Sequence, residues 1–447
     1  MKPFRLHQIC IALMLLYAAS GCSHPGEIRL PLSEKEGFGP FDITFKGAAV
    51  NPENESSPWY RLKLHPANAP EGMSGIEYGS LDTDIKQSVY QGFHSGLVSP
   101  EFYQALQDAW VWEPDTTLLS QAHVKTMVAF AIGKNEAGET VVAVDTDNDL
   151  DLADEKIFVP ADIDSIYGSG DPDSAATANI IDIHVEQFPR GKKKGLTVPT
   201  SIAYDSGRGY IFAAFATYSE AVYKGSRIAV KPLQDLSYDN YGLQAVLSDD
   251  IDPATGKVPW EKMLYSGDIM DIDGDLLRIK GVDTKDNALI LERIPHSGTD
   301  IYSNQEGFKT YPFNGKEFSS GLGISLEDYR GKYVLLDFWA LGCGPCLREF
   351  PVLKELYSRT ARDRFEIISI ICPGDSASIT DIIREYGLVW PQVMADSDSR
   401  NIIGTYNVTY YPATFLIGPD GKIIKKDLRG QALVDKVLAL TGETDKE

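Results

Sequence analysis

The sequence predicts a multidomain protein with a β-rich N-terminal region, sandwich or barrel-like in form, followed by a C-terminal α/β domain. The chain has 447 residues, which is too long for one ordinary domain. Over residues 37–300, short apolar and β-branched runs are separated by Gly-rich turns, a pattern typical of antiparallel sheets. From about residue 305 to 447, strand patterns alternate with helix patterns, as in an α/β sheet.

Residues 1–21 are expected to be a lipoprotein signal peptide. Lys2 and Arg5 precede an apolar run over 9–19, which is too short to cross a bilayer as a helix. The run ends in Ala-Ser-Gly before Cys22, which resembles a bacterial lipobox, where the cysteine is lipidated. We therefore expect a lipid anchor on Cys22; an ordinary signal peptide cleaved nearby is the alternative.

The net charge and the expected lipid anchor bear on the partners and the cellular location of the protein. The net charge is −22, so no basic surface is available to attract phosphates, and nucleic-acid binding is not expected. Residues 22–36 are polar and are predicted to tether the lipid to the folded body. We expect the protein in the bacterial cell envelope, lipid-anchored and facing the periplasm, with outer-membrane or cell-surface placement left open.

The β-rich region, 37–300, offers no evident catalytic group, because its histidines are scattered singly. One helix is expected at Pro100–Trp110, and residues 164–179 are expected to be a loop. Strands are expected at 124–132 and 140–144, forming a hairpin, and at 180–188, 196–204, 210–222, 227–230, 276–279 and 288–293.

One acidic stretch in this region has two interpretations. Alternating carboxylates on a turn can hold Ca²⁺. Leu150 stands where an EF-hand needs Gly, however, and Lys156 stands where the closing Glu belongs. A solvated hairpin connection is favoured, calcium binding stays open, and no metal ligand is assigned. The stretch contains Asp145, Asp147, Asp149, Asp151 and Asp154.

The C-terminal domain contains two cysteines separated by two residues, Cys343 and Cys346. They follow a predicted buried strand, Tyr333–Trp339, whose apolar run is interrupted only by Asp337. A helix is expected to begin at the pair, and a helix N-terminus favours the thiolate of the first cysteine. Half of a zinc site is the alternative, but residues 301–447 hold only one further cysteine, Cys372, and no histidine. A redox pair is therefore favoured.

The remaining elements of this domain follow from the same pattern. A strand at Phe365–Ile371 and two short strands at 414–417 and 423–425 are expected to join the sheet. Helices are expected over 346–359, 379–386 and 432–440, the first of them containing Pro351.

This segment resembles the TlpA-type extracytoplasmic thioredoxin family over about residues 305–447, a third of the chain. The matching motifs are Gly331-Lys332, Asp337-Phe338-Trp339-Ala340, Cys343-Gly344-Pro345-Cys346, Pro351, and Tyr411-Pro412-Ala413-Thr414-Phe415. The resemblance implies a thioredoxin fold, thiol-disulfide oxidoreductase activity and no cofactor.

The resemblance also implies a role for each site residue. Cys343 would attack a substrate disulfide, and Cys346 would resolve the mixed disulfide. Gly344 and Pro345 would shape the turn between them, since Pro fixes φ and lacks an N–H. Pro412 would be a cis-proline facing the disulfide. Asp337 would take the proton from Cys346, because burial raises the pKa of a carboxyl.

Four features of this chain qualify the resemblance. Gly342 stands where thioredoxins usually carry Trp, and the strand Phe365–Ile371 lacks the basic residue that thioredoxin places near its buried Asp. Cys372 is interpreted as an inert thiol, with a third redox thiol as the alternative. Ala340 stands where a peroxidatic site needs Thr, which disfavours a peroxidase.

The leading hypothesis is a lipid-anchored reductase of protein disulfides, because Gly-Pro between the cysteines is typical of reducing thioredoxins, with potentials near about −270 mV. Its partners would be disulfide-bearing protein substrates, a membrane electron donor, and the membrane itself through the lipid on Cys22. Two alternatives stay open. One is a disulfide oxidase or isomerase with the same site; the other is a binding lipoprotein whose thioredoxin domain is accessory.

Overall fold

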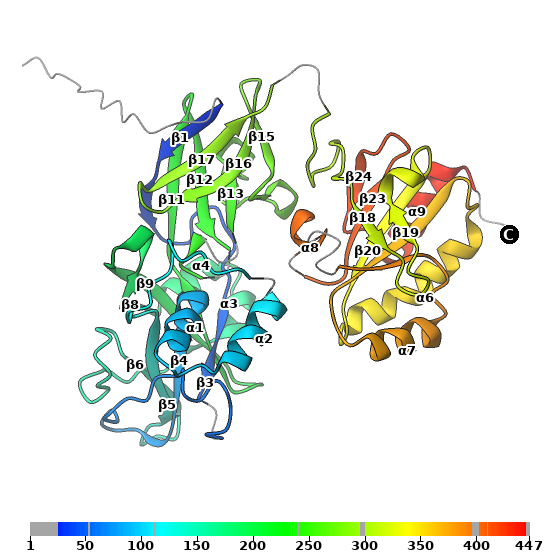
Figure 1. Ribbon diagram of the computed structural model, residues 1–447. Coiled ribbons are helices and arrows are strands. Elements are labelled where there is room, and N and C mark those ends of the chain that lie inside the picture. Colours follow the sequence, from blue (N-terminus) through cyan, green and yellow to red (C-terminus); the bar gives the residue numbers. More distant parts are fainter. Residues whose placement is uncertain are drawn as a thin grey trace, which may run out of the picture.

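The computed structural model describes residues 26–443, except 52–53, 111, 234, 239–241, 296–299, 396–401 and 409. The predicted signal peptide and the predicted lipid site at Cys22 lie outside these residues. Figure 1 shows a β-rich region, coloured blue to green, beside an α/β domain coloured yellow to red. Among the described residues, no helix is both long enough and apolar enough to cross a membrane.

Two sheets pack against each other at one end of the β-rich region. They share one core, in which Leu30 and Leu289 of the first meet Ile228 and Ala245 of the second. The four-stranded sheet has the order β1 (Glu27–Pro31), β17 (Ala288–Arg293), β16 (Asp275–Asp283), β15 (Ile269–Ile272). The five-stranded sheet has the order β14 (Leu264–Tyr265), β13 (Leu243–Leu247), β12 (Ser226–Pro232), β11 (Thr217–Tyr223), β2 (Ser33–Glu36).

The predicted tether over 22–36 is wrong from Glu27 onward, because β1 and β2 are paired strands. β1 hydrogen-bonds antiparallel to β17, and β2 does the same with β11. Every residue of β2 is exposed, so its sequence resembles a loop, although its backbone completes the edge of a sheet. The partners of both strands lie far away in the sequence, which is why local pattern does not reveal them.

A third, eight-stranded sheet makes up the other end of the β-rich region. One apolar core includes residues of seven of its strands, among them Phe130, Ile183 and Ile211. The predicted strand 210–222 is divided at Ala216, which is fully buried, so that β10 joins this sheet and β11 joins the five-stranded one. The path is β6 (Thr140–Val144), β5 (Met127–Lys134), β4 (Ser74–Asp82), β3 (Lys46–Val50), β10 (Tyr210–Phe215), β9 (Lys194–Asp205), β7 (Ala161–Asp162), with β8 (Ile180–Gln187) also on β9.

Within the described residues, four α-helices accompany these sheets. The predicted helix Pro100–Trp110 is confirmed as α2, whereas the predicted loop at 164–179 is wrong, since it contains α3 and α4. Asp162 and Asp171 cap those two short helices by accepting hydrogen bonds from backbone N–H groups. The helices are α1 (Ile85–His94), α2 (Pro100–Trp110), α3 (Ile163–Gly168) and α4 (Pro172–Thr177).

The C-terminal domain is an α/β domain, as the sequence predicted. Its five-stranded sheet has helices on both faces and includes a strand at Gln392–Met394 that the sequence pattern did not predict. β20 is central; it runs parallel to β21 and antiparallel to β23. The order is β22 (Gln392–Met394), β21 (Phe365–Ile371), β20 (Tyr333–Trp339), β23 (Ala413–Ile417), β24 (Ile423–Lys426), and a separate hairpin pairs β18 (Asn314–Lys316) with β19 (Gly323–Ser325). The helices are α6 (Gly344–Arg359), α7 (Ser376–Tyr386), α8 (Ile402–Thr405) and α9 (Gly430–Thr441).

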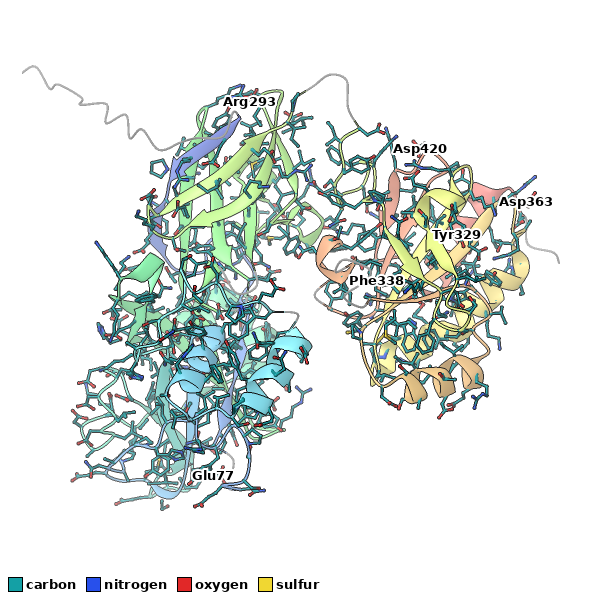
Figure 2. All side chains as sticks on the ribbon, viewed as in Figure 1. Glu77, Arg293, Tyr329, Phe338, Asp363 and Asp420 are labelled. Carbon is teal, nitrogen blue, oxygen red and sulfur yellow. A yellow bond between two sulfur atoms is a disulfide. The ribbon has the colours of Figure 1, made fainter. Side chains whose placement is uncertain are left out.

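Alternate residues of β20 enter two separate cores, because successive side chains of a strand point to opposite faces. Leu335 and Trp339 pack with α6 and α9, whereas Leu336 and Phe338 pack on the opposite face with α8. Figure 2 labels Phe338 inside the domain. Asp337 is two residues from both Leu335 and Trp339, so its side chain lies on the same face of the strand. Its carboxyl therefore faces the layer of α6 and α9.

The segment 300–311 connects the two parts of the chain through specific hydrogen bonds. The side-chain amide of Gln305 accepts from the N–H of Ile269 at 2.6 Å and donates to its carbonyl at 2.8 Å. Arg278 donates to the carbonyl of Tyr302 at 2.7 Å and to the hydroxyl of Tyr311 at 2.9 Å. The α/β domain is therefore attached to β15 and β16 by more than a covalent linker.

Candidate active site

Cys343 and Cys346 form a disulfide at the point where β20 leads into α6, with Cα atoms 5.3 Å apart. Cys343 is the N-cap residue of α6, and its Sγ accepts a hydrogen bond from the N–H of Cys346 at 3.1 Å. Gly344 and Pro345 form the first turn of the helix, where the missing N–H of Pro costs nothing. The position gives Cys343 the N–H groups and positive dipole end that favour a thiolate.

The two sulfurs differ in access. Cys343 is partly exposed, whereas Cys346 is 1% exposed and packs in the core with Trp339 and Phe350. A large reactant can therefore reach the first cysteine and not the second. This asymmetry favours Cys343 as the attacking sulfur and Cys346 as the resolving one.

Asp337 is a buried acid on the same face of the sheet as the helix that carries the cysteines. Its side chain is 2% exposed and accepts a hydrogen bond from the hydroxyl of Ser369 at 2.9 Å. Ser369 in turn accepts from the indole N–H of Trp390 at 2.9 Å. Burial raises the pKa of Asp337 to about 7, and the Ser369 hydrogen bond opposes that rise. A carboxyl with this pKa can exchange a proton near neutral pH.

Two charged residues that the sequence analysis did not single out also act on Asp337. The carboxylate of Glu349, on α6, raises the pKa of Asp337, and the guanidinium of Arg429, just before α9, lowers it. Glu349 Oε2 accepts a hydrogen bond from the N–H of Gly430 at 3.0 Å. Charged residues at a helix surface carry no sequence signal that distinguishes them from a solvated face, so only the structure identifies these two.

The loop before β23 supplies a cis peptide bond, Tyr411–Pro412, as the resemblance implied. Pro412 is buried, and its carbonyl accepts a hydrogen bond from Arg429. Burial raises the pKa of Tyr411, as does its hydrogen bond with the thiol of Cys372. Cys372 is a partly buried free cysteine whose N–H donates to the carbonyl of Trp339 at 2.8 Å. It therefore lies beside the same end of the sheet, without a disulfide partner in the described part of the chain.

Gly342, next to the attacking cysteine, adopts a φ of +76°, where residues with a side chain are strained. A Cβ added there would meet no atom within 4 Å. Where thioredoxins usually carry Trp, this chain therefore has a glycine with positive φ and open space beside it. The surface next to Cys343 differs accordingly.

The acidic stretch of the β-rich region brings Asp145, Asp147 and Asp149 together, with one carboxylate oxygen of each within 4.8 Å of the others. Asp145 is fully buried and accepts hydrogen bonds from the N–H groups of Asp149 at 2.9 Å and Leu150 at 3.1 Å. These hydrogen bonds satisfy the buried carboxylate of Asp145 and stabilise the turn. No metal is therefore assigned to the cluster.

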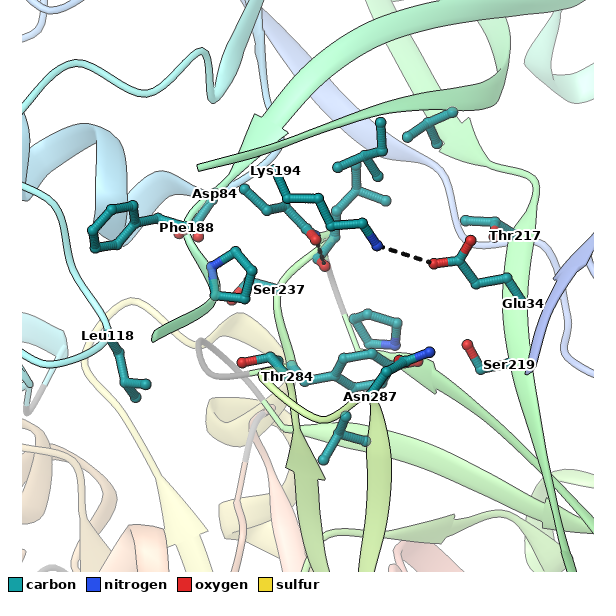
Figure 3. Close-up of a pocket in the computed structure, with 18 of the residues that line it drawn as sticks. Glu34, Asp84, Leu118, Phe188, Lys194, Thr217, Ser219, Ser237, Thr284 and Asn287 are labelled. Atoms are coloured by element: carbon teal, nitrogen blue, oxygen red, sulfur yellow. Dashed lines mark hydrogen bonds and ion pairs between the residues drawn. The ribbon is translucent and has the colours of Figure 1, made fainter. Parts of the chain in front are cut away.

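A cavity of about 180 Å³ lies in the β-rich region, away from the redox pair. Figure 3 shows Lys194 and Glu34 facing each other across it, with N and O atoms 3.8 Å apart. Its wall combines apolar side chains such as Phe188 with the polar Thr284 and Asn287. None of the lining residues belongs to the C-terminal domain, so this cavity takes no part in the redox site.

A cysteine pair at a helix N-terminus, a buried acid and a cis-proline just before β23 together define a thioredoxin-like redox domain. The comparisons with known proteins agree. Residues 311–426 match the AhpC/TSA family. The C-terminal domain is thus thioredoxin-like, and its relatives are thiol-disulfide oxidoreductases, as the predicted resemblance to the TlpA type indicated.

Two relatives are thiol-disulfide oxidoreductases named ResA. The one from Bacillus thuringiensis (strain Al Hakam) is 37% identical over 106 residues, and the one from Bacillus subtilis (strain 168) is 35% identical over 109 residues. Each match covers 24% of this chain and 60% of the relative, so the chain spans less than two thirds of the length of these relatives.

Solved structures similar to the chain include the thioredoxin domain of a thiol-disulfide oxidoreductase from Bacteroides vulgatus. It is 31% identical, with 30% of this chain and 97% of that chain covered and a TM-score of 0.29. A thiol:disulfide interchange protein from Bacteroides sp. is 29% identical, with coverages of 31% and 91% and a TM-score of 0.29.

Proposed function

We propose that the protein is a lipid-anchored thiol-disulfide oxidoreductase of the cell envelope that reduces disulfides of other proteins. The observation that carries the proposal is the unequal access of the two sulfurs, with Cys343 partly exposed at a helix N-terminus and Cys346 buried in the core on the face of the sheet toward which Asp337 points. The relatives named thiol-disulfide oxidoreductases support the same reaction class.

The first step uses the reduced pair. The thiolate of Cys343 attacks one sulfur of the substrate disulfide, forming a mixed disulfide and releasing the other substrate sulfur as a thiolate. The N–H of Cys346, which lies 3.1 Å from Cys343 Sγ, stabilises negative charge on the attacking sulfur.

The second step resolves the mixed disulfide. Asp337 takes the proton of the Cys346 thiol, and the resulting thiolate attacks Cys343 Sγ, which releases the second substrate thiolate. Two electrons pass from the cysteine pair to the substrate, and the pair ends as the disulfide seen in the structure. A pKa of about 7 lets Asp337 accept this proton near neutral pH.

Turnover then needs a donor of two electrons, for which we propose a membrane dithiol protein. The anchor on Cys22 would hold the domain near such a donor. A Cys22→Ser variant is expected to leave the membrane fraction and appear in the soluble envelope fraction; retention at wild-type level would contradict the anchor.

The reaction is tested by trapping. In a Cys346→Ala variant the mixed disulfide cannot be resolved, so defined partners should accumulate on Cys343 and be identified by mass spectrometry after non-reducing electrophoresis. A Cys343→Ala variant is the matched control and should trap none. If the Cys346→Ala variant traps nothing while the β-rich region captures a ligand, the alternative of a binding lipoprotein with an accessory redox domain replaces this proposal.

The direction of the reaction is tested by the reduction potential of the Cys343–Cys346 pair, measured against glutathione buffers. A reductase is expected near about −270 mV, the value of thioredoxin. A potential well above about −200 mV would favour the oxidase or isomerase alternative instead.

A further inference from the structure

A second cavity of the β-rich region, of about 380 Å³, lies between α1 and three other segments of the chain. These segments are residues 61–64, residues 121–127 at the start of β5, and residues 148–150 after β6. The volume falls in the range of small-molecule sites, about 300 to 1,000 Å³. No residue of the α/β domain lines this cavity, so it is separate from the redox pair.

Two glutamine side chains of α1 hold one wall of the cavity in place. Gln91 Oε1 accepts from the N–H of Val124 at 2.8 Å, and its Nε2 donates to the carbonyl of Val124 at 3.0 Å. Gln87 makes the same pair of hydrogen bonds with Ser120, at 2.9 and 2.8 Å. All four residues are buried. The wall is therefore fixed before any ligand enters, which lowers the entropic cost of binding.

Cations predominate among the charged side chains that line the cavity, although the whole chain has a net charge of −22. Arg61, Lys63 and Lys125 line it, together with one acid, Asp149. Lys63 is buried and forms an ion pair with Asp82, at a distance of 2.8 Å between Nζ and Oδ2. The charge of Lys63 is thus already compensated.

The other two cations are not compensated in this way. Lys125 Nζ donates a hydrogen bond to the backbone carbonyl of Asn148 at 2.6 Å. Neither Lys125 nor Arg61 forms an ion pair with another residue that the structure describes. Two positive charges at the cavity are therefore available to an anionic ligand, and a cavity wall of low dielectric strengthens their attraction.

Two exposed leucines supply apolar surface to the same cavity. Leu97 is 40% exposed and Leu150 is 36% exposed, and both are lining residues. Leu150 has a φ of +70°, which strains a residue with a side chain. Its N–H donates to Asp145 Oδ2 at 3.1 Å, and its carbonyl accepts from the N–H of Ala67 at 3.0 Å. The acidic turn therefore holds an apolar side chain at the cavity in a conformation that leucine disfavours, as occurs at ligand sites.

We propose that this cavity binds an organic carboxylate with an apolar chain of medium length. The carboxylate accepts hydrogen bonds from Arg61 and Lys125, because a guanidinium and an ammonium both form charge-assisted bonds with carboxylates. The chain lies against Leu97 and Leu150. The carboxylate of Asp149 on the wall favours a ligand with one negative charge over a dianionic phosphate. This site gives the β-rich region a ligand of its own, beyond the proposed redox function.

The test measures binding of octanoate to the full chain by isothermal titration calorimetry at pH 7.5. Octylammonium has the same chain with the opposite charge, and acetate has the same charge without the chain. Octanoate should bind at least about ten-fold more tightly than either compound, because it alone satisfies both the cations and the apolar wall.

Four variants connect this binding to the cavity. Lys125→Gln and Arg61→Gln should each weaken octanoate binding about three- to ten-fold, since each removes one charge. Lys280→Gln is the matched control, because this lysine lies on β16 with its side chain 53% exposed, and it should change nothing. Leu150→Gly should also weaken binding about three- to ten-fold. It should not lower the midpoint of thermal unfolding, because glycine adopts a positive φ without strain.

Three results would each overturn the inference. One is the absence of octanoate binding up to about 10 mM. Another is octylammonium binding as tightly as octanoate. The third is wild-type affinity for octanoate in Lys125→Gln, Arg61→Gln and Leu150→Gly. These results are distinguishable from a failure of the redox function, since trapping through Cys343 does not involve the cavity.

Discussion

Replacing Asp337 by asparagine is expected to stabilise the C-terminal domain, and increasingly so as the pH rises. The folded-state pKa of Asp337 is raised from 3.8 to about 7 by burial. A carboxyl with a raised folded-state pKa contributes its full stability below pH 3.8. As the pH rises from 3.8 through 7, this contribution is lost, because the carboxyl ionises in the unfolded chain before it ionises in the folded one. Asparagine cannot ionise, yet its amide oxygen can still accept the Ser369 hydrogen bond.

The magnitude follows from the two pKa values. A shift of about 3 units, at about 1.4 kcal/mol per unit, gives roughly 4 kcal/mol at pH 8.5, where both states are ionised. At pH 5 the carboxyl of Asp337 is ionised in the unfolded chain but not in the folded one. Because pH 5 lies about one unit above the unfolded-state pKa, the difference is roughly 1.7 kcal/mol. The free energy of unfolding of Asp337→Asn should therefore exceed that of wild type by about 2 to 3 kcal/mol more at pH 8.5 than at pH 5.

The assay is pulse proteolysis in urea on the oxidised proteins, with peptides of the two regions quantified separately by mass spectrometry. The β-rich region serves as an internal control, and Asp363→Asn, an exposed acid of the same domain labelled in Figure 2, is the matched variant. Asp363→Asn should show no such pH dependence. The reasoning is refuted if the free energies of unfolding of Asp337→Asn and wild type differ by the same amount at pH 5 and pH 8.5, within about 0.5 kcal/mol. The pKa of Asp337 would then not be raised by burial.

Three further substitutions test the local geometry. Ser369→Ala removes the hydroxyl that donates to Asp337 at 2.9 Å, so the pKa of Asp337 should rise by roughly one unit; an unchanged acid limb of the resolving step would contradict this. Gly342→Trp should fold, because a Cβ there meets no atom, but should lose about 1 to 2 kcal/mol in urea unfolding through its φ of +76°. Gly79→Ala should cost about 1 to 3 kcal/mol, since its Cβ would lie 2.1 Å from the Phe130 ring; wild-type stability would show that this ring can move.

Elements whose cause is local could be predicted from the sequence. The apolar run of β20 and the cysteines after it predict a buried strand and a helix, and both are present. The helix α2 and the hairpin of β5 and β6 were also predicted, because periodicity and turn residues lie within a few positions of each other.

Elements that depend on partners far away in the sequence could be identified only from the folded chain. The strands β1 and β2 form only because β17 and β11 supply hydrogen bonds from about 180 to 260 residues away along the chain. The charged residues that influence Asp337 also come together only through folding. Asp337 itself is conspicuous in an apolar strand, whereas Glu349 and Arg429 look like ordinary surface residues until folding brings α6 and the start of α9 to the same buried carboxyl. A pKa depends on burial and on charge separation in space, and neither is a property of the local sequence.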